Sequence, residues 1–160
     1  MAGGPIFPTS IYVGGASGQL SPNFYIPATN TNTAGAIEGV ALVASSSIDA
    51  PCVLQFNLPE VIPSGTCKIR ALAFSSATSG TAVCNIADGQ TAPNNNIGAT
   101  SLTSETPISQ AWATADIILE NKVTLTTTPT SNDIMTVLAT FKSSGTLAAQ
   151  SIWQFSLIWE

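Results

Sequence analysis

The sequence predicts an all-β fold: a single-domain antiparallel β-sandwich or jelly roll of about eight strands, with an extended N-terminal arm. Residues 151–160 carry the strongest strand pattern, because large apolar side chains alternate there with polar ones and so share one face of an extended chain. That row consists of Trp153, Phe155, Leu157 and Trp159. Residues 134–142 alternate in the same way, and turn signals recur along the chain at roughly 8–12-residue intervals. The two C-terminal strands are therefore expected to lie in the sandwich around which the rest of the chain is wrapped.

The first 35 residues are expected to form the arm, and residues 36–160 the sandwich. No charged side chain precedes Glu38, and the prolines of this stretch favour extended backbone over helix. Its short apolar clusters need a partner, either the body of the same domain or a neighbouring subunit, and one or two short edge strands are expected there. The candidate partner-binding residues are Ile6, Phe7, Ile11, Tyr12, Val13, Phe24 and Tyr25.

Five segments between the arm and the C-terminal pair are predicted to be strands, because apolar residues alternate or run on within them and turn residues bound them. They are residues 36–44, 52–58, 67–74, 81–86 and 123–128. The first is apolar in both rows, which favours a central strand. Asp88-Gly89 and the asparagines after Pro93 predict a long connection. In residues 111–119 a helical turn competes with a strand.

The composition indicates a surface of small and hydroxyl side chains. Charged residues make up only 8% of the chain, against about 25% in an ordinary soluble domain, whereas the sequence contains 18 Ser and 20 Thr. Such a surface has little charge repulsion to keep copies apart, which suits a protein that belongs to an assembly. A weakly charged monomer is the alternative.

The distribution of charge argues against two classes of partner. The net charge is −5, and no basic cluster is present to neutralise phosphates, so no nucleic-acid binding is expected. The first basic residue is Lys68, so no signal peptide is predicted. No apolar run approaches the roughly 20 residues of a membrane span, so no membrane partner is expected either.

Catalytic signatures are missing from the sequence. The absence of histidine removes the Ser–His and Cys–His nucleophile arrangements. Asp116 and Glu120 are the nearest approach to a paired-carboxylate site, but two acids at this spacing occur by chance in almost any chain. We therefore expect no enzyme activity, no catalytic residue and no cofactor.

The residues able to hold a metal or form a disulfide give equally weak signals. Cys52 and Cys67 lie in strand-like runs and are interpreted as small buried apolar residues, although one disulfide among them and Cys84 stays open. Acids in or beside loops are able to hold calcium, but their spacing is not that of an EF-hand, so we interpret them as solvated and predict no metal site. These acids are Asp88, Glu105, Asp116, Glu120 and Asp133.

Trp112 is the one tryptophan outside a clean strand alternation. An exposed ring there would offer a stacking surface for a ligand such as a sugar. The alternative interpretation, which we favour, is that it packs under the long connection that precedes it.

From residue 50 to its end, the chain resembles small β-sandwich proteins encoded in the structural modules of tailed bacteriophages. The resemblance rests on residues 53–59 (VLQFNLP), 63–73 (PSGTCKIRALA) and 76–83 (SATSGTAV). In these proteins a strand ending in Pro leads through a Pro/Gly loop to a strand with a basic residue, and then to a small-residue turn. The strand that opens at Asn132-Asp133-Ile134 and the strand that closes the chain also match.

The resemblance implies a non-enzymatic viral structural protein, a capsid decoration (cement) protein made in the host cytoplasm and located on the capsid surface of the virion. Its expected partners are the major capsid protein and further copies of itself, commonly in a homotrimer. The alternative is a receptor- or glycan-binding module of a phage tail or head fibre.

Overall fold

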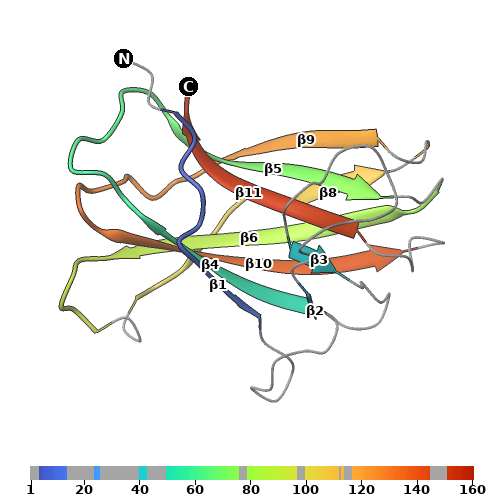
Figure 1. Ribbon diagram of the computed structural model, residues 1–160, viewed down its shortest axis with the longest axis horizontal. Coiled ribbons are helices and arrows are strands. Elements are labelled where there is room, and N and C mark those ends of the chain that lie inside the picture. The colour runs from blue at the N-terminus through green and yellow to red at the C-terminus, as the bar shows by residue number, and fades with distance from the viewer. Residues whose placement is uncertain are drawn as a thin grey trace.

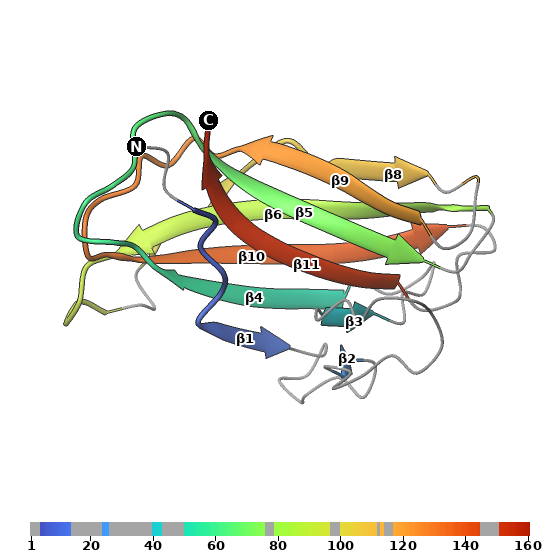
Figure 2. The same ribbon diagram turned by 45° about the horizontal axis from the view of Figure 1, so that its top comes forward.

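The computed structural model describes residues 4–13, 24–25, 40–42, 50–75, 79–96, 100–111, 113, 117–144 and 151–160. Within these ranges all regular secondary structure is β-strand, and the strands form two antiparallel sheets that pack as two layers (Figures 1 and 2). The predicted all-β antiparallel sandwich is therefore confirmed. Eleven strands are described, and eight of them contain four or more residues.

The first sheet has the strand order β1-β4-β10-β6-β7, and β8 also pairs with β6. Its strands are β1 (Ser10–Val13), β4 (Ala50–Asn57), β6 (Thr81–Thr91), β7 (Thr103–Ser104), β8 (Ile108–Ala111) and β10 (Ile134–Ser144). In the register of its centre, Val137 of β10 stands opposite Leu54 of β4 on one side and Asp88 of β6 on the other.

The second sheet has the order β2-β3-β11-β5-β9. Its strands are β2 (Phe24–Tyr25), β3 (Val40–Leu42), β5 (Cys67–Ser75), β9 (Ile117–Thr124) and β11 (Ser151–Trp159). The strands predicted from the end of the sequence, β10 and β11, are thus the central strands of opposite sheets. The described part of the central strand predicted in residues 36–44 is β3, which lies between β2 and β11; residues 36–39 and 43–44 lie outside the described residues.

The core lies between the two layers and is built by strict alternation. The described members of the predicted inward rows are buried, namely Met135, Val137 and Ala139 of β10 and Phe155, Leu157 and Trp159 of β11, whereas the side chains of Phe141 and Trp153 lie outside the described residues. β4, β5 and β6 each contribute a matching row. The largest fully buried side chains are Phe56, Leu54, Ile69, Ile86, Met135, Leu157 and Val137. Leu125 continues the buried row of Val123, but the strand predicted over residues 123–128 is wrong beyond Thr124, where β9 ends.

The N-terminal segment crosses from one sheet to the other. The N–H of Ile6 donates to the carbonyl oxygen of Leu157 (N···O 2.9 Å), and the N–H of Leu157 donates back to Ile6 (2.8 Å). Three residues later the N–H of Thr9 donates to Gln55 of the other sheet (2.8 Å), and β1 then pairs with β4. The expected short edge strands of this region are confirmed, since β1 and β2 each end a sheet.

Both chain ends gather at one end of the sandwich with the β4–β5, β6–β7 and β9–β10 connections (Figures 1 and 2). There the chain end is fixed by the β4–β5 connection: the N–H of Thr66 donates to Glu160 (2.8 Å), and that of Glu160 donates to Thr66 (3.2 Å). Gly65 has a φ of 114°, and a Cβ built on it would lie 2.9 Å from the Glu160 oxygen. A side chain at this position is therefore excluded on two counts.

Two further details of the sequence prediction differ from the structure. Asp88-Gly89 does not begin the long connection, because β6 continues to Thr91 and pairs with β10 over its whole length. The backbone ladder outweighs the local turn preference of Asp-Gly. Residues 100–111, for most of which no strand was predicted, contain β7 and β8, which pair with the outer edge of β6.

In residues 111–119 the described ends are strand: Ala111 closes β8 and Ile117 opens β9, whereas 112 and 114–116 lie outside the described residues. No helix among the described residues is long and apolar enough to cross a membrane.

A comparison of two phenylalanines tests the assignment of the core. Phe56 is 0% exposed, whereas Phe7 is 50% exposed. We expect Phe56→Ala to lower the free energy of unfolding by about 3–5 kcal/mol, because it leaves a cavity between the sheets. Phe7→Ala, the matched control, should change it by less than about 1 kcal/mol. Urea unfolding followed by tryptophan fluorescence measures both, and equal losses would contradict the assignment of the core.

Candidate functional site

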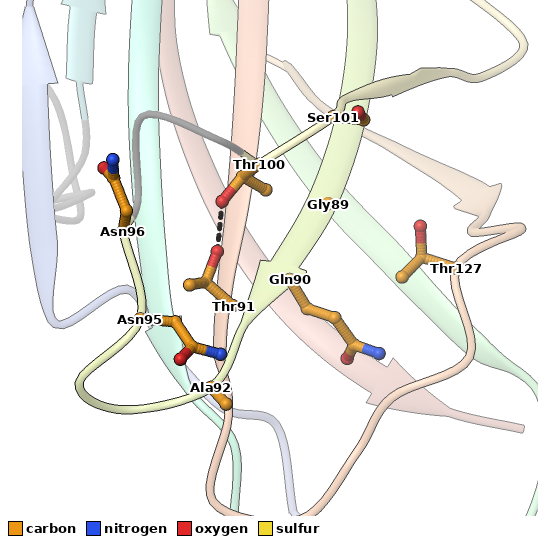
Figure 3. Close-up of a pocket in the computed structure, with 9 residues that line it drawn as sticks. All are labelled: Gly89, Gln90, Thr91, Ala92, Asn95, Asn96, Thr100, Ser101 and Thr127. Atoms are coloured by element: carbon orange, nitrogen blue, oxygen red, sulfur yellow. Dashed lines mark hydrogen bonds between the residues drawn. The ribbon is translucent and has the colours of Figure 1, made fainter.

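An open hollow of about 600 Å³ lies beside the end of β6. We call it the polar hollow. Figure 3 shows its lining side chains, which come from the last residues of β6, from the turn that follows, from the segment leading to β7 and from the β9–β10 connection. They are Gly89, Gln90, Thr91, Ala92, Asn95, Asn96, Thr100, Ser101 and Thr127.

Gly89 lets the segment before β7 pass directly over the backbone of β6. A Cβ built at this position would lie 2.5 Å from the carbonyl oxygen of Ser101 and 3.0 Å from the Thr100 methyl group. Any other residue would therefore displace one wall of the polar hollow. The hydroxyl groups of Thr91 and Thr100 hydrogen-bond across the same junction (Figure 3).

Gln90 fixes the opposite wall. Its side-chain amide donates to the carbonyl oxygen of Thr128 (2.8 Å) and to the Thr130 hydroxyl (3.0 Å), and its carbonyl oxygen accepts from the N–H of Thr130 (3.0 Å). The β9–β10 connection is thereby tied to the end of β6. At the rim, Asn94 adopts a positive φ of 68° and the N–H of Asn95 donates to Ala92, which closes a tight turn.

The lining of the polar hollow offers hydroxyl and amide groups and no charged side chain. Such groups donate and accept hydrogen bonds with neutral partners, and Asn95 and Ser101 are exposed at the rim. The arrangement is suited to holding an uncharged, hydrogen-bonding ligand.

Directly behind the polar hollow, Asp88 faces the core. Its side chain is 0% exposed, and neither carboxylate oxygen has a hydrogen-bond partner. Burial raises its pKa to about 6, and the neighbouring Glu105 carboxyl group also raises it. The prediction that Asp88 is a solvated loop acid is therefore wrong, because it is the next inward residue of β6 after Ile86.

Glu105 is half-buried and anchored by the β9–β10 connection. Its Oε1 accepts from the N–H and from the hydroxyl of Thr126, both at 2.7 Å. Although burial acts in the opposite direction, its interactions with Asp88 and Thr126 lower the pKa of Glu105. The two acids thus form an unequal pair at the edge of the core.

Five other charged side chains form ion pairs on the outer face of the second sheet. Lys68 and Lys122 both bind the Glu160 carboxylate, the first at 2.9 Å, and Arg70 binds Glu120. Hydrogen bonds from Lys122, which has the larger effect, and from Lys68 lower the pKa of Glu160 to about 2. Glu120 is therefore the ion-pair partner of Arg70. Asp116, the other member of the carboxylate pair considered in the sequence analysis, lies outside the described residues.

The three cysteines offer no reactive group. All are free and buried, so the disulfide alternative is not realised and the interpretation of Cys52 and Cys67 as small buried residues is confirmed. Burial raises the pKa of both to about 12, and raises that of Cys84 as well. Among the described residues no three His, Cys, Asp or Glu side chains are grouped to hold a metal ion.

The residues predicted to bind a partner occupy different environments in the structure. Ile6 packs against the core, whereas Phe7 is half exposed. Ile11, Tyr12 and Val13 form most of β1, and Phe24 and Tyr25 are β2, all in edge strands. Trp112, the candidate stacking residue, lies outside the described residues.

Sequence reasoning missed the polar hollow and four exposed apolar side chains. The Asn-rich turn and the glycine of Asp88-Gly89 were visible, but only as signs of a connection. The exposed side chains are Val61, Leu102, Ile117 and Ile118.

Comparison with known proteins finds no matching family model, and no curated protein matches the sequence. Among solved structures, TmCBM61 in complex with beta-1,4-galactotriose aligns with a TM-score of 0.43 and 13% sequence identity, over 95% of this chain and 90% of that one. Similarity at this level carries no functional argument.

Thiol titration tests the burial of the cysteines. We expect none of the three to react with an aromatic disulfide reagent at pH 8 in the folded protein, because the raised pKa values leave almost no thiolate and burial blocks access. In denaturant all three should react. Rapid reaction of one cysteine under native conditions would show that its strand is not packed as described.

Proposed function

We propose that this protein is a non-enzymatic virion structural protein, a decoration (cement) protein on the outside of a phage head that braces neighbouring capsomers. The resemblance of residues 50–160 to phage β-sandwich proteins supports this role. The observation that carries it on the molecular side is Phe7: a large apolar ring, 50% exposed, on a segment whose neighbours are fixed by backbone hydrogen bonds to both sheets.

The rigid attachment of Phe7 favours a binding role. Ile6 is bridged to Leu157 on one side, and Thr9 is hydrogen-bonded to Gln55 on the other, so the ring is presented with little conformational freedom. A preorganised side chain loses less entropy when it is buried in an interface. Complete burial of a Phe side chain contributes roughly 1.5–3 kcal/mol.

Val61 adds a second apolar contact at the same end of the sandwich. It is 79% exposed on the β4–β5 connection, which Figures 1 and 2 place beside the chain ends. We propose that this end contacts the major capsid protein or a neighbouring copy, with a homotrimer as the assembled form. Since the outer-face cations are paired with Glu120 and Glu160, the contact would rest on apolar burial and hydrogen bonds.

Substitution of Phe7 tests this assignment. We expect Phe7→Ser to leave the unfolding midpoint nearly unchanged and to reduce occupancy on purified heads by about 10-fold or more, because a central aromatic anchor is lost. Ile118→Ser, on the β9 edge and also more than half exposed, is the control that should retain occupancy. Quantitative gel analysis of sedimented particles gives occupancy, and light scattering gives the mass in solution. Unchanged occupancy in Phe7→Ser and Val61→Ser would refute the proposed contact.

A second candidate function, glycan binding by a tail- or head-fibre module, is supported by the polar hollow. Its lining of hydroxyl and amide groups matches the hydrogen-bonding pattern of a neutral sugar, and Gln90 is held rigidly by three hydrogen bonds. Among the described residues that line it, none carries an aromatic ring for stacking.

Glycan arrays distinguish the two functions. If the fibre role is correct, the protein binds neutral glycans, and Asn95→Ala together with Ser101→Ala weakens binding at least 10-fold by removing exposed hydrogen-bonding groups. Glu60→Gln, on an exposed connection away from the polar hollow, should bind normally. Loss of binding in Trp112→Ala alone would move the site to the tryptophan, and no binding by the wild type would remove this function.

A further inference from the structure

Asp88 presents an electrostatic problem that its described neighbours solve only in part. Its carboxylate is fully buried and neither oxygen has a partner in hydrogen-bonding geometry, although the Thr127 hydroxyl lies beside it and acts to lower its pKa. A buried ionised carboxylate is strongly destabilising unless a cation or several donors compensate it. The register of β6 holds the side chain inward, because Asp88 is paired with Val137 of β10 inside an eleven-residue ladder.

The described cations are elsewhere. Lys68, Arg70 and Lys122 are occupied by Glu160 and Glu120 on the outer face of the second sheet. The remaining basic residue, Lys142, is paired through its backbone with Val83, five positions along β6 from Asp88. The neighbour that Asp88 does have is a second acid, Glu105, which increases the local negative charge.

We propose that Asp88 and Glu105 bind a hard divalent cation of the calcium type. Two carboxyl groups from adjacent segments, one of them buried and unpartnered, are oxygen ligands of the kind that Ca²⁺ prefers. The Thr127 hydroxyl lies beside Asp88 and supplies a further oxygen. Main-chain carbonyl groups and water complete the six to eight ligands that the ion takes.

The geometry of Glu105 is compatible with this role. The side chain of Glu105 lies against that of Asp88, and its Oε1 is held by two hydrogen bonds from Thr126. The same bonds hold the carboxylate against the β9–β10 connection. An ion between Asp88 and Glu105 would therefore join β6, the segment after β7 and that connection at one point.

The consequence is a brace behind the polar hollow. Thr127 belongs both to the lining of the hollow and to the surroundings of Asp88, so an ion there would fix the wall that Gln90 also holds. The site does not depend on either proposed function, because it rests on the burial of Asp88 and on the position of Glu105 beside it.

Thermal unfolding of the full-length protein tests the site. In 5 mM CaCl₂ the midpoint should exceed that in EDTA by about 5–10 °C when the ion is about 100-fold above its Kd, because the ion binds only the folded state. MgCl₂ should shift the midpoint less, since Mg²⁺ demands stricter octahedral geometry. Isothermal titration with CaCl₂ gives the stoichiometry, which should be one.

Three variants decide the assignment. Asp88→Asn should abolish the calcium shift and yet be at least as stable as the wild type in EDTA, since it removes an uncompensated buried charge. Glu105→Gln keeps an acceptor for Thr126 and should reduce the shift, whereas Glu60→Gln, an exposed acid elsewhere, should retain it in full. Equal midpoints of the wild type in CaCl₂ and EDTA, a shift that survives in Asp88→Asn, or a larger shift in MgCl₂ would overturn the proposal.

Discussion

The fold depends on the packing of two inward rows against each other, one from β10 and one from β11. Met135, Val137 and Ala139 of β10, and Phe155, Leu157 and Trp159 of β11, are buried in one continuous core. Because these strands are central in opposite sheets, every other strand is added to one of them directly or through a neighbour. The C-terminal part of the chain therefore sets the register for segments that precede it by more than 50 residues.

This arrangement explains why one end of the sandwich carries the features of functional interest. The chain end is held by Thr66, the segment from Ile6 to Thr9 passes from sheet to sheet beside it, and Gln90 ties β6 to the β9–β10 connection. These contacts convert several connections into a rigid surface. Rigid connections on a sheet scaffold are well placed to present single side chains and shallow binding sites to a partner.

Alternation in the sequence was sufficient to predict the fold class, the central strands and their buried rows, because apolar and polar residues alternate along a half-buried strand. It was not sufficient for β7 and β8, whose burial is slight, nor for the extent of β6, where pairing with β10 outweighs an Asp-Gly turn signal. The polar hollow was beyond prediction, since it arises from segments brought together only by the ladder and by the contact of Gly89 with Ser101. That Ile6 packs against the core while Phe7 is exposed also could not be predicted, because it depends on the path of the backbone.

The placement of charge ties these observations together. Of a small number of ionisable side chains, Lys68, Arg70, Lys122, Glu120 and Glu160 neutralise one another on one sheet face, and Asp88 is withdrawn into the core. Exposed ion pairs of this kind contribute little to stability, so their main effect is to leave few unpaired charges on that face. For the proposed binding of a partner, this arrangement favours recognition by shape, apolar contacts and hydrogen bonds over recognition by charge on that face. A fixed Phe7 ring and a hollow of hydroxyl and amide groups are the elements that such recognition requires.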